Sequence, residues 1–228
     1  MDSGPVITDC GDSAVMVRAG GADAWGFVHA LAAALDTTGL HSVIPAYDSL
    51  LVEFDCTRTD HAAVRTLIRQ AATRRDPARP AGRRFTVPVL YGGDHGPDLP
   101  VVARELGLSE REVVELHSGR PLTVRCLGAP AGSPMMDGPS FPKPVSRLAS
   151  PRTSVPPGSV AVAGRQAVIC PVRSPGGWPL LGRTPLRVLD LTAEPFTAYR
   201  PGDEFRFVPI EAGQWDDYRG AVLVADHG

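Results

Sequence analysis

The chain has 228 residues, which is enough for one large domain or two small ones with buried cores. Hydrophobic residues make up 43% and charged residues 21%, which excludes a disordered chain, while 24 glycines and 23 prolines predict many turns and short strands. The formal net charge of −2 excludes the cationic field that recruits nucleic acid or anionic membranes.

The N-terminal part alternates between strand and helix patterns. Period-two alternation predicts strands, and apolar residues three and four positions apart predict helices. The predicted elements are a strand at 13–19, a helix at 22–35, strands at 42–46 and 49–54, a helix at 60–74 with Asp60 as its N-cap, and a strand at 83–89. This βαββαβ order predicts a ferredoxin-like domain over 1–82. The basic segment at 74–84, which carries Pro and Gly, is typical of a solvated loop or a hinge.

A short helical pair and a β-rich region follow. One helix covers 98–106 and stops at Gly107, and the next begins at Ser109, has Glu112 at the capping-box position and ends near Gly119, a C′-type glycine. Strand-like pieces then lie at 122–127, 159–163, 167–170 and 204–210. Short strands separated by Pro and Gly predict a compact β-barrel or sandwich, which we expect over 83–228.

The cysteines Cys10, Cys56, Cys126 and Cys170 are far apart and form no C-x-x-C motif. This spacing predicts reduced thiols rather than a zinc ribbon. The N-terminus shows no signal-peptide pattern, and no apolar run approaches the ~20 residues needed to span a bilayer. We therefore expect a soluble, cytoplasmic protein.

Acidic and imidazole groups cluster in the glycine-rich segment after the strand at 83–89. Asp94, His95 and Asp98 invite a metal interpretation, but their spacing fits no zinc or EF-hand pattern. A turn into the next helix, with Asp98 as its cap, explains the segment better, and we expect no bound metal.

The densest binding signal is the run SPGGWPLLGRTPL at 174–186. Gly176 and Gly177 allow a ligand to approach the backbone closely, and Trp178 can form an apolar wall. Arg183 and Thr184 supply hydrogen-bond donors that suit a carboxylate or a phosphate. The alternative is a tight β-turn with a core tryptophan.

Three further side chains are candidates for the same site. Arg152 lies among prolines on an inflexible loop, which favours a binding role. Gln166 follows a strand and a glycine, where its amide could bind a ligand amide or tether a loop. His117 ends a helix, where it could act in catalysis or cap free carbonyls. Because the chain has no P-loop, G-x-S-x-G or H-E-x-x-H motif, these residues indicate a binding cleft rather than a particular reaction.

Several motifs in a fixed order resemble one known family. They are GDSA at 11–14, IPAYDSLLV at 44–52, VPVLYGGDHGPDL at 87–99, LSEREVVELH at 108–117, PRTSVPPGSVA at 151–161, SPGGW at 174–178, LGRTPLR at 181–187 and RPGDEFRFVPI at 200–210. The resemblance runs from about residue 8 to 210. On these motifs the chain resembles the family that contains the B-type subunit of 5-oxoprolinase, allophanate hydrolase subunit 1 and the KipI-type histidine-kinase inhibitor.

The resemblance implies a cyclophilin-like barrel after the ferredoxin-like domain and a larger partner subunit of similar barrel fold. In 5-oxoprolinase a third subunit joins, and the complex opens 5-oxoproline to glutamate with ATP as co-substrate. No tightly bound cofactor is implied. Carried to this chain, the expected catalytic residues are His117, Gln166 and Arg152, and the expected substrate-binding residues are Arg183, Thr184, Gly176, Gly177, Trp178, Pro171 and Met135. His117 would shuttle a proton, the two arginines would hold a carboxylate or a carboxyphosphate-like group, and Gln166 would bind the amide.

Two segments depart from the family's usual pattern. The run LGAPAGSPMMDG at 127–138 lacks two phenylalanines and a tyrosine that family members usually carry, so small residues and flexible methionines replace an aromatic wall. The run GRQAVICP at 164–171 replaces GGQTGIYP, which removes a threonine and a tyrosine hydroxyl and adds the charge of Arg165. We expect the fold to survive these changes and either the substrate or catalysis itself to differ.

Two other functions stay open on the sequence. A regulator like KipI would bind the helical dimerisation domain of a sensor kinase, with Met135 and Met136 as candidate contacts. A divergent catalyst that works without a partner would act on a bulky substrate in a widened groove, and the altered segment at 129–138 motivates that hypothesis.

Overall fold

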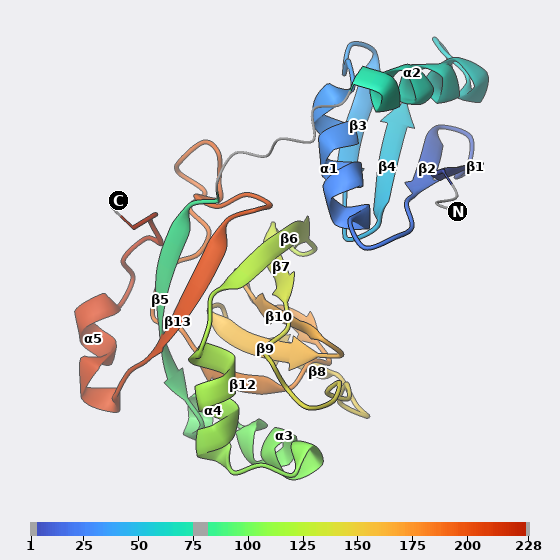
Figure 1. The fold of residues 1–228 in the computed structure, drawn as a ribbon. Helices are drawn as coiled ribbons and strands as arrows, with labels where there is room; N and C mark the ends of the chain where they lie inside the picture. The colour runs from blue at the N-terminus through green and yellow to red at the C-terminus, as the bar shows by residue number, and fades with distance from the viewer. Residues whose placement is uncertain (1–3, 75–81, 227–228) are drawn as a thin grey trace. The chain divides into compact units, whose positions relative to one another are not determined.

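The computed structural model of the chain describes residues 4–74 and 82–226. It contains two compact units, Met1–Pro80 and Ala81–Gly228, which Figure 1 shows in colours running from blue to red. The sequence places the domain boundary at 82/83, and most of the proposed hinge at 74–84 lies outside the described residues. In the described part of the chain, no helix is both long and apolar enough to cross a membrane.

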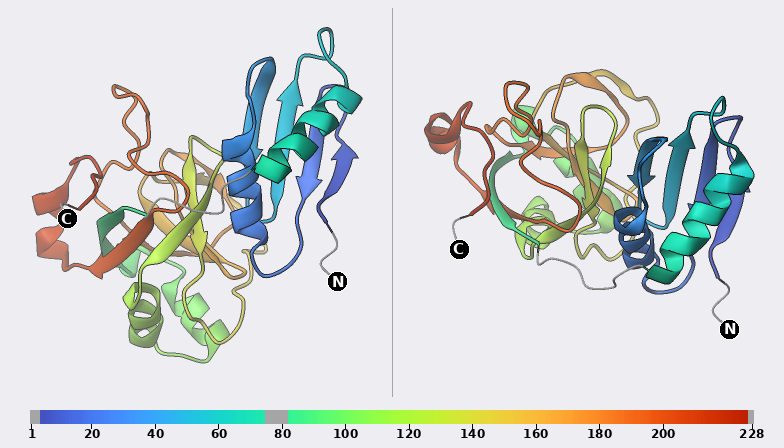
Figure 2. Two further views of the ribbon diagram at one scale, coloured as in Figure 1. Left: turned by 45° about the horizontal axis from the view of Figure 1, so that its top comes forward. Right: turned by 90° about the horizontal axis from the view of Figure 1, so that it is seen from above.

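The first unit is a four-stranded antiparallel sheet with both helices on one face (Figure 2). Its elements are β1 (Val6–Asp9), β2 (Ala14–Arg18), α1 (Ala24–Ala34), β3 (Leu40–Pro45), β4 (Ser49–Phe54) and α2 (His61–Arg74). The strand order is β1-β2-β4-β3. Alternate residues of β4 (Leu50, Val52 and Phe54) are buried and pack with Val28 of α1 and Ile68 of α2. Period-two alternation on the strands and apolar spacing on the helices thus produce one shared core.

The predicted βαββαβ order is wrong at its last strand. The strand predicted at 83–89 forms as β5 (Arg84–Tyr91), but it pairs in parallel with β13 (Glu204–Pro209) of the second unit. In the first unit the edge beside β2 is instead occupied by β1, which the sequence analysis did not predict. Asp60 is confirmed as a cap, because its Oδ1 accepts a 2.8 Å hydrogen bond from the Ala63 N–H at the start of α2.

The second unit is a closed barrel of seven strands in the order β10-β7-β6-β13-β5-β12-β9, as the β-rich pattern predicted. Its other elements are η1 (Gly93–His95), α3 (Leu99–Leu106), α4 (Glu110–Ser118), β6 (Leu122–Gly128), β7 (Ser133–Asp137), β8 (Arg152–Val155), β9 (Ser159–Ala163), β10 (Gln166–Ile169), β11 (Ser174–Gly176), β12 (Leu180–Arg183), η2 (Ala212–Gln214) and α5 (Trp215–Tyr218). The strands β8 and β11 form a separate two-stranded sheet. The main core includes Phe85, Leu122, Ile169, Leu181 and Phe207, contributed by five different barrel strands.

The helix pair α3–α4 forms as predicted, with one difference. Ser109 and Glu112 make the reciprocal capping box, and Gly107 ends α3 in the left-handed conformation with φ 74°. Gly119 is not a left-handed C′ glycine, because its φ of −69° is right-handed. A side chain would nevertheless be excluded there, since a Cβ would lie 2.7 Å from the Glu115 carbonyl oxygen.

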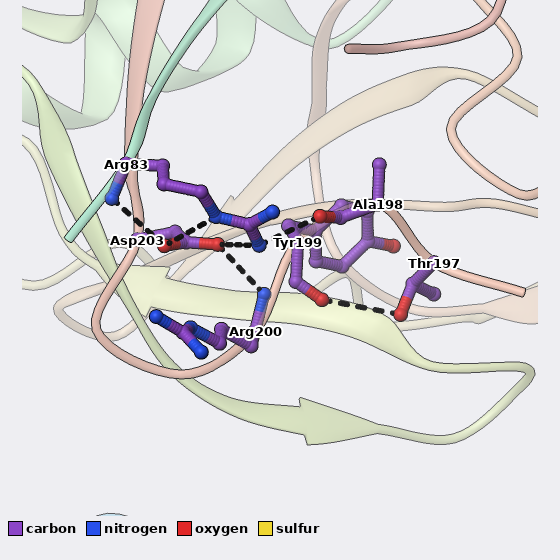
Figure 3. A network of polar contacts seen from close by, with 6 residues as sticks. All are labelled: Arg83, Thr197, Ala198, Tyr199, Arg200 and Asp203. Carbon is purple, nitrogen blue, oxygen red and sulfur yellow. Dashed lines mark hydrogen bonds and ion pairs between the residues drawn. The ribbon is translucent and has the colours of Figure 1, made fainter. Parts of the chain in front are cut away.

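A buried carboxylate connects the start of β5 to the turn before β13 (Figure 3). Asp203 is fully buried and accepts hydrogen bonds from the Arg83 N–H at 2.9 Å, the Arg83 guanidinium at 2.7 Å and the Arg200 N–H at 2.9 Å. The same guanidinium donates to the Ala198 carbonyl at 2.7 Å. The carboxylate therefore satisfies donors from two segments about 120 residues apart in sequence.

Candidate functional site

A pocket of about 330 Å³ lies between the barrel wall and the β8–β11 sheet. We call it the Trp178 pocket. It is lined by Ala129, Pro130, Ser133, Met135, Arg147, Val155, Ala161, Val168, Cys170, Ser174, Pro175, Gly176, Gly177, Trp178 and Leu180.

The floor of the Trp178 pocket is the outer face of the barrel. Successive residues of a strand point to opposite faces, so the neighbours of a core residue point outward. Ala161, Val168 and Leu180 form a small cluster of their own with Val155 of β8, while Val160 and its inward-pointing equivalents belong to the main core. The pocket therefore has an apolar floor that is separate from the barrel interior.

One wall of the pocket combines an indole ring with a guanidinium. The Arg147 Cζ lies 5.8 Å from the centroid of the Trp178 ring, within the range of a cation–π contact. The Leu148 N–H donates to the Gly177 carbonyl at 2.8 Å, which ties the Arg147 segment to the glycine pair. In the described residues Arg147 has no carboxylate partner, so its charge is available to a ligand.

Arg147 is not among the site residues predicted from the sequence. The residue lies in the irregular segment between β7 and β8, in no motif, and only the backbone hydrogen bond to Gly177 brings it to the pocket. No pattern in the sequence around Arg147 predicts this contact, because it joins positions about 30 residues apart that share no periodicity.

The predicted site residues divide among several places rather than one groove. Four of the predicted substrate-binding residues, Gly176, Gly177, Trp178 and Met135, line the Trp178 pocket. Pro171, Arg183 and Thr184 line a second pocket of about 570 Å³, which we call the Arg183 pocket. Gln166 is half-buried at the start of β10 and lines neither of the two pockets.

The segment between β10 and β11 separates the two pockets. Cys170 and Ser174 line the Trp178 pocket, whereas Pro171 and Val172 line the Arg183 pocket. The strand β12 is shared in the same way, with Leu180 in the first pocket and Arg183 in the second. The two pockets are therefore neighbours with a common wall.

Arg152 is a structural partner of Asp98. Its Nη2 donates to Asp98 Oδ1 at 2.7 Å, and Asp98 Oδ2 accepts from the Leu180 N–H at 2.8 Å. Asp98 occupies the N-cap position of α3 but makes no capping hydrogen bond, so its expected role as a cap is wrong. Arg152 lines neither pocket, and its charge is neutralised by Asp98, which also binds the backbone of the pocket residue Leu180.

His117 is buried in the barrel core and cannot reach either pocket. It is 0% exposed, its ring lies 4.6 Å from that of Phe207, and its Nδ1 is 2.7 Å from the Tyr91 hydroxyl. Its Nε2 is also buried and has no hydrogen-bond partner among the described residues. Burial lowers the pKa of His117 to about 3, so the ring is neutral at physiological pH. The expected role of His117 as a proton shuttle in the groove is therefore wrong in this structure.

Two other interpretations from the sequence change with the structure. Met136 is fully buried, so it cannot contribute to an exposed contact patch for a kinase. His95 stacks on Trp215 with ring centroids 4.5 Å apart, and Asp98 binds Arg152. In the described part of the chain no group of three or more His, Cys, Asp or Glu side chains is arranged to hold a metal ion.

Cys170 in the Trp178 pocket is expected to resist alkylation. Burial raises the pKa of its thiol to about 11, so only about one molecule in a thousand carries the reactive thiolate at pH 8. The exposed Cys10 and Cys56 serve as internal controls. Mass spectrometry after a brief iodoacetamide pulse should find these two labelled at least about tenfold faster than Cys170. Equal labelling of all three would show that the pocket thiol is ionised.

The chain thus combines a closed barrel, which has ligand-sized pockets on its outer wall, with a smaller α+β unit. Residues 5–199 match the family model described as carboxyltransferase domain, subdomain C and D. The chain belongs to this family.

Individual relatives agree with that assignment. The chain is similar to the B-type subunit of 5-oxoprolinase from Bacillus subtilis (strain 168), with 34% identity over 93% of this chain and 96% of the relative. The solved structure of TTHA0988 is 35% identical with a TM-score of 0.74 over 87% of this chain, which spans only 40% of the length of TTHA0988. The urea amidolyase of K. lactis shares the fold, with a TM-score of 0.80 at 17% identity over 98% of this chain and 16% of its own.

Proposed function

We propose that the chain is a subunit of a cytoplasmic, ATP-dependent hydrolase complex that opens a small lactam or amide, with 5-oxoproline as the first candidate substrate. The 5-oxoprolinase relative from Bacillus subtilis, which aligns over 93% of this chain, supports the type of complex. The Trp178 pocket supports the type of substrate.

The observation that carries the substrate class is the guanidinium beside an indole ring above an apolar floor. A lactam acid such as 5-oxoproline has a carboxylate, a flat five-membered ring with apolar methylenes, and an amide. Arg147 would bind the carboxylate, Trp178 would pack against the ring, and the Ser174 hydroxyl at the pocket rim would donate to the lactam carbonyl. Gly176 and Gly177 allow the ligand to approach this rim closely.

The same pocket supports the need for a partner chain. Among its described lining residues the ionisable side chains are those of Arg147 and Cys170, and burial holds the Cys170 thiol in its protonated form. Ser133 donates its hydroxyl hydrogen to the Pro130 carbonyl, and the described lining contains no histidine or carboxylate that could activate Ser133 or Ser174. The pocket can bind and orient a substrate, so we assign the general base and the ATP-dependent step to the larger barrel subunit, with or without a third subunit. This composition argues against a catalyst that works alone.

The altered family positions support a changed substrate. Ala129, Met135, Val168 and Cys170 all line the Trp178 pocket, and all lie in the two segments that depart from the family's usual pattern. Arg165, another departure, lies in the turn between β9 and β10 and lines neither pocket. The specificity of the pocket is therefore the property that we expect to differ between this chain and its relatives.

Arg147→Gln is expected to raise the KM for the lactam acid about tenfold and to change kcat less, because a charge-assisted hydrogen bond to a bound carboxylate is lost. The assay is substrate-dependent ATP hydrolysis by this chain together with its larger barrel subunit. Arg206→Gln, which removes an exposed arginine of β13 that lines neither pocket, is the matched control. Unchanged KM in Arg147→Gln would remove the carboxylate-binding role, and ATP hydrolysis that neither 5-oxoproline nor any other lactam or amide stimulates would refute the proposed reaction.

A further inference from the structure

The Arg183 pocket carries an excess of positive charge that the proposed reaction does not use. Three arginines line it (Arg183, Arg187 and Arg219), and no Asp or Glu is among its described lining residues. Arg219 is paired with Asp216 at 2.5 Å, so its charge is compensated. Neither Arg183 nor Arg187 has a carboxylate within ion-pair distance in the described chain, although the charge of Arg187 contributes to lowering the pKa of Asp190, after the hydrogen bonds from Thr192. The pocket therefore has two guanidiniums without a direct carboxylate partner.

Arg183 is held in place by neutral groups. Its Nε donates to the Pro157 carbonyl at 2.7 Å, and its Cζ lies 5.8 Å from the centroid of the Trp215 ring, whose stacking on His95 fixes the indole in turn. The two terminal nitrogens of the guanidinium make no hydrogen bond with described residues, and they are not sealed from solvent. Because a carbonyl and an aromatic ring orient this arginine, its two terminal guanidinium nitrogens remain available to donate hydrogen bonds to an anion.

The electrostatic surroundings of Arg183 favour an anionic occupant. Burial, and then the charge of Arg173, lower the pKa of Arg183, and the charge of Arg183 contributes to lowering the pKa of His95. Like charges that lie this close repel one another, and a bound anion would relieve that repulsion. Phosphoryl groups suit this arrangement best, because they offer several acceptor oxygens to two guanidiniums at once.

Apart from Thr184, the other side chains that line the Arg183 pocket are mainly apolar. Val172, Leu189 and Leu191 line the pocket, and the Leu191 side chain is 71% exposed. An inorganic ion would leave this apolar surface uncovered, whereas an organic group attached to a phosphate would cover it.

We propose that the Arg183 pocket binds a phosphorylated organic molecule, with the phosphoryl group on Arg183 and Arg187 and the organic part against Val172 and Leu191. The site is distinct from the Trp178 pocket, and it does not depend on the reaction proposed for that pocket.

Isothermal titration of the full chain with pyrophosphate, ADP and citrate tests the proposal. ADP is expected to bind more tightly than pyrophosphate, and citrate is expected to bind at least about tenfold more weakly than either. Arg187→Gln should lower the affinities for ADP and for pyrophosphate about tenfold. We expect this variant to fold normally, because the Arg187 side chain is exposed and makes no hydrogen bond or ion pair with described residues. Arg206→Gln should leave both affinities unchanged.

A second variant separates the two parts of the site. Leu191→Ser should lower the affinity for ADP severalfold and leave the affinity for pyrophosphate unchanged, because the substitution removes only apolar contact. The proposal is overturned if neither phosphorylated probe binds at about 1 mM, if citrate competes equally, or if Arg187→Gln binds as tightly as Arg206→Gln. Equal losses for both probes in Leu191→Ser would overturn the assignment of the organic part.

Discussion

Asp203→Ala is expected to lower the free energy of unfolding by about 3–5 kcal/mol, the cost of removing one partner from a buried ionic network. The carboxylate is fully buried and accepts from two backbone N–H groups and one guanidinium. Without it, the Arg83 and Arg200 N–H groups lose their acceptor, and the start of β5 is no longer fixed to the turn before β13. Urea denaturation followed by circular dichroism measures the change.

The neighbouring residue provides a matched control for Asp203. Glu204 is partly exposed on β13, and its carboxylate lies 3.4 Å from the Arg84 guanidinium. Solvent-accessible ion pairs of this kind contribute about 0–1 kcal/mol, so Glu204→Ala should destabilise the protein only slightly. If the two alanine variants unfold at the same urea concentration, the Asp203 network does not stabilise the barrel as argued.

The stability of the protein is expected to fall as the pH drops from about 6.5 towards 3, and His117 is the source of a steep part of that fall. Burial lowers the pKa of His117 from 6.5 to about 3. Between these values the unfolded chain binds a proton at His117 and the folded chain does not, so acid favours unfolding. This one group contributes a slope that approaches about 1.4 kcal/mol per pH unit, and its stabilising contribution is complete above pH 6.5.

His117→Phe should remove that slope. The variant keeps an aromatic ring beside Phe207 and Tyr91 but cannot be protonated. We expect it to be less stable than the natural chain at pH 7, because the Tyr91 hydroxyl loses its partner, and to lose less stability on acidification. His41→Gln, at an exposed position in the first unit, should retain the natural pH dependence. Parallel stability curves for the natural chain and His117→Phe between pH 4 and pH 7 would contradict the burial argument.

Local patterns in the sequence predicted local structure well. The capping box at Ser109, the stop at Gly107 and the alternation of β4 depend on residues within a few positions of one another. Short strands separated by Pro and Gly predicted a β-barrel or a sandwich, and the family resemblance implied the barrel that the structure shows. For each of the local features, the interactions that form the structure lie within the same segment as the sequence pattern that predicts it.

Long-range pairing escaped prediction for the opposite reason. Whether β5 belongs to the first sheet or to the barrel is decided by its pairing with β13, which is 120 residues away in register. His117 was expected at a helix end that reaches the groove, but Phe207 of β13 and Tyr91 of β5 enclose it. Neither burial nor pairing of this kind leaves a trace in the neighbouring sequence.

The candidate site was predicted in part. Glycines, a tryptophan and an arginine in one run predicted a single binding site, yet Trp178 and Arg183 line different pockets. Pro179 and most of the extended strand β12 separate the two side chains, so proximity in sequence did not mean a shared cavity. Arg147 shows the converse, because it is distant in sequence from Trp178 and adjacent to it in space.

Because residues 170–174 and β12 form a common wall, we expect a ligand bound in one pocket to change the affinity of the other pocket. A ligand that displaces Pro171 or Val172 would also displace Cys170 and Ser174, and would thereby change the free energy of ligand binding in the Trp178 pocket. Such coupling is reciprocal, because each ligand changes the dissociation constant of the other by the same factor. Through this coupling, the proposed subunit could respond to the molecule in one pocket by changing its affinity for the molecule in the other.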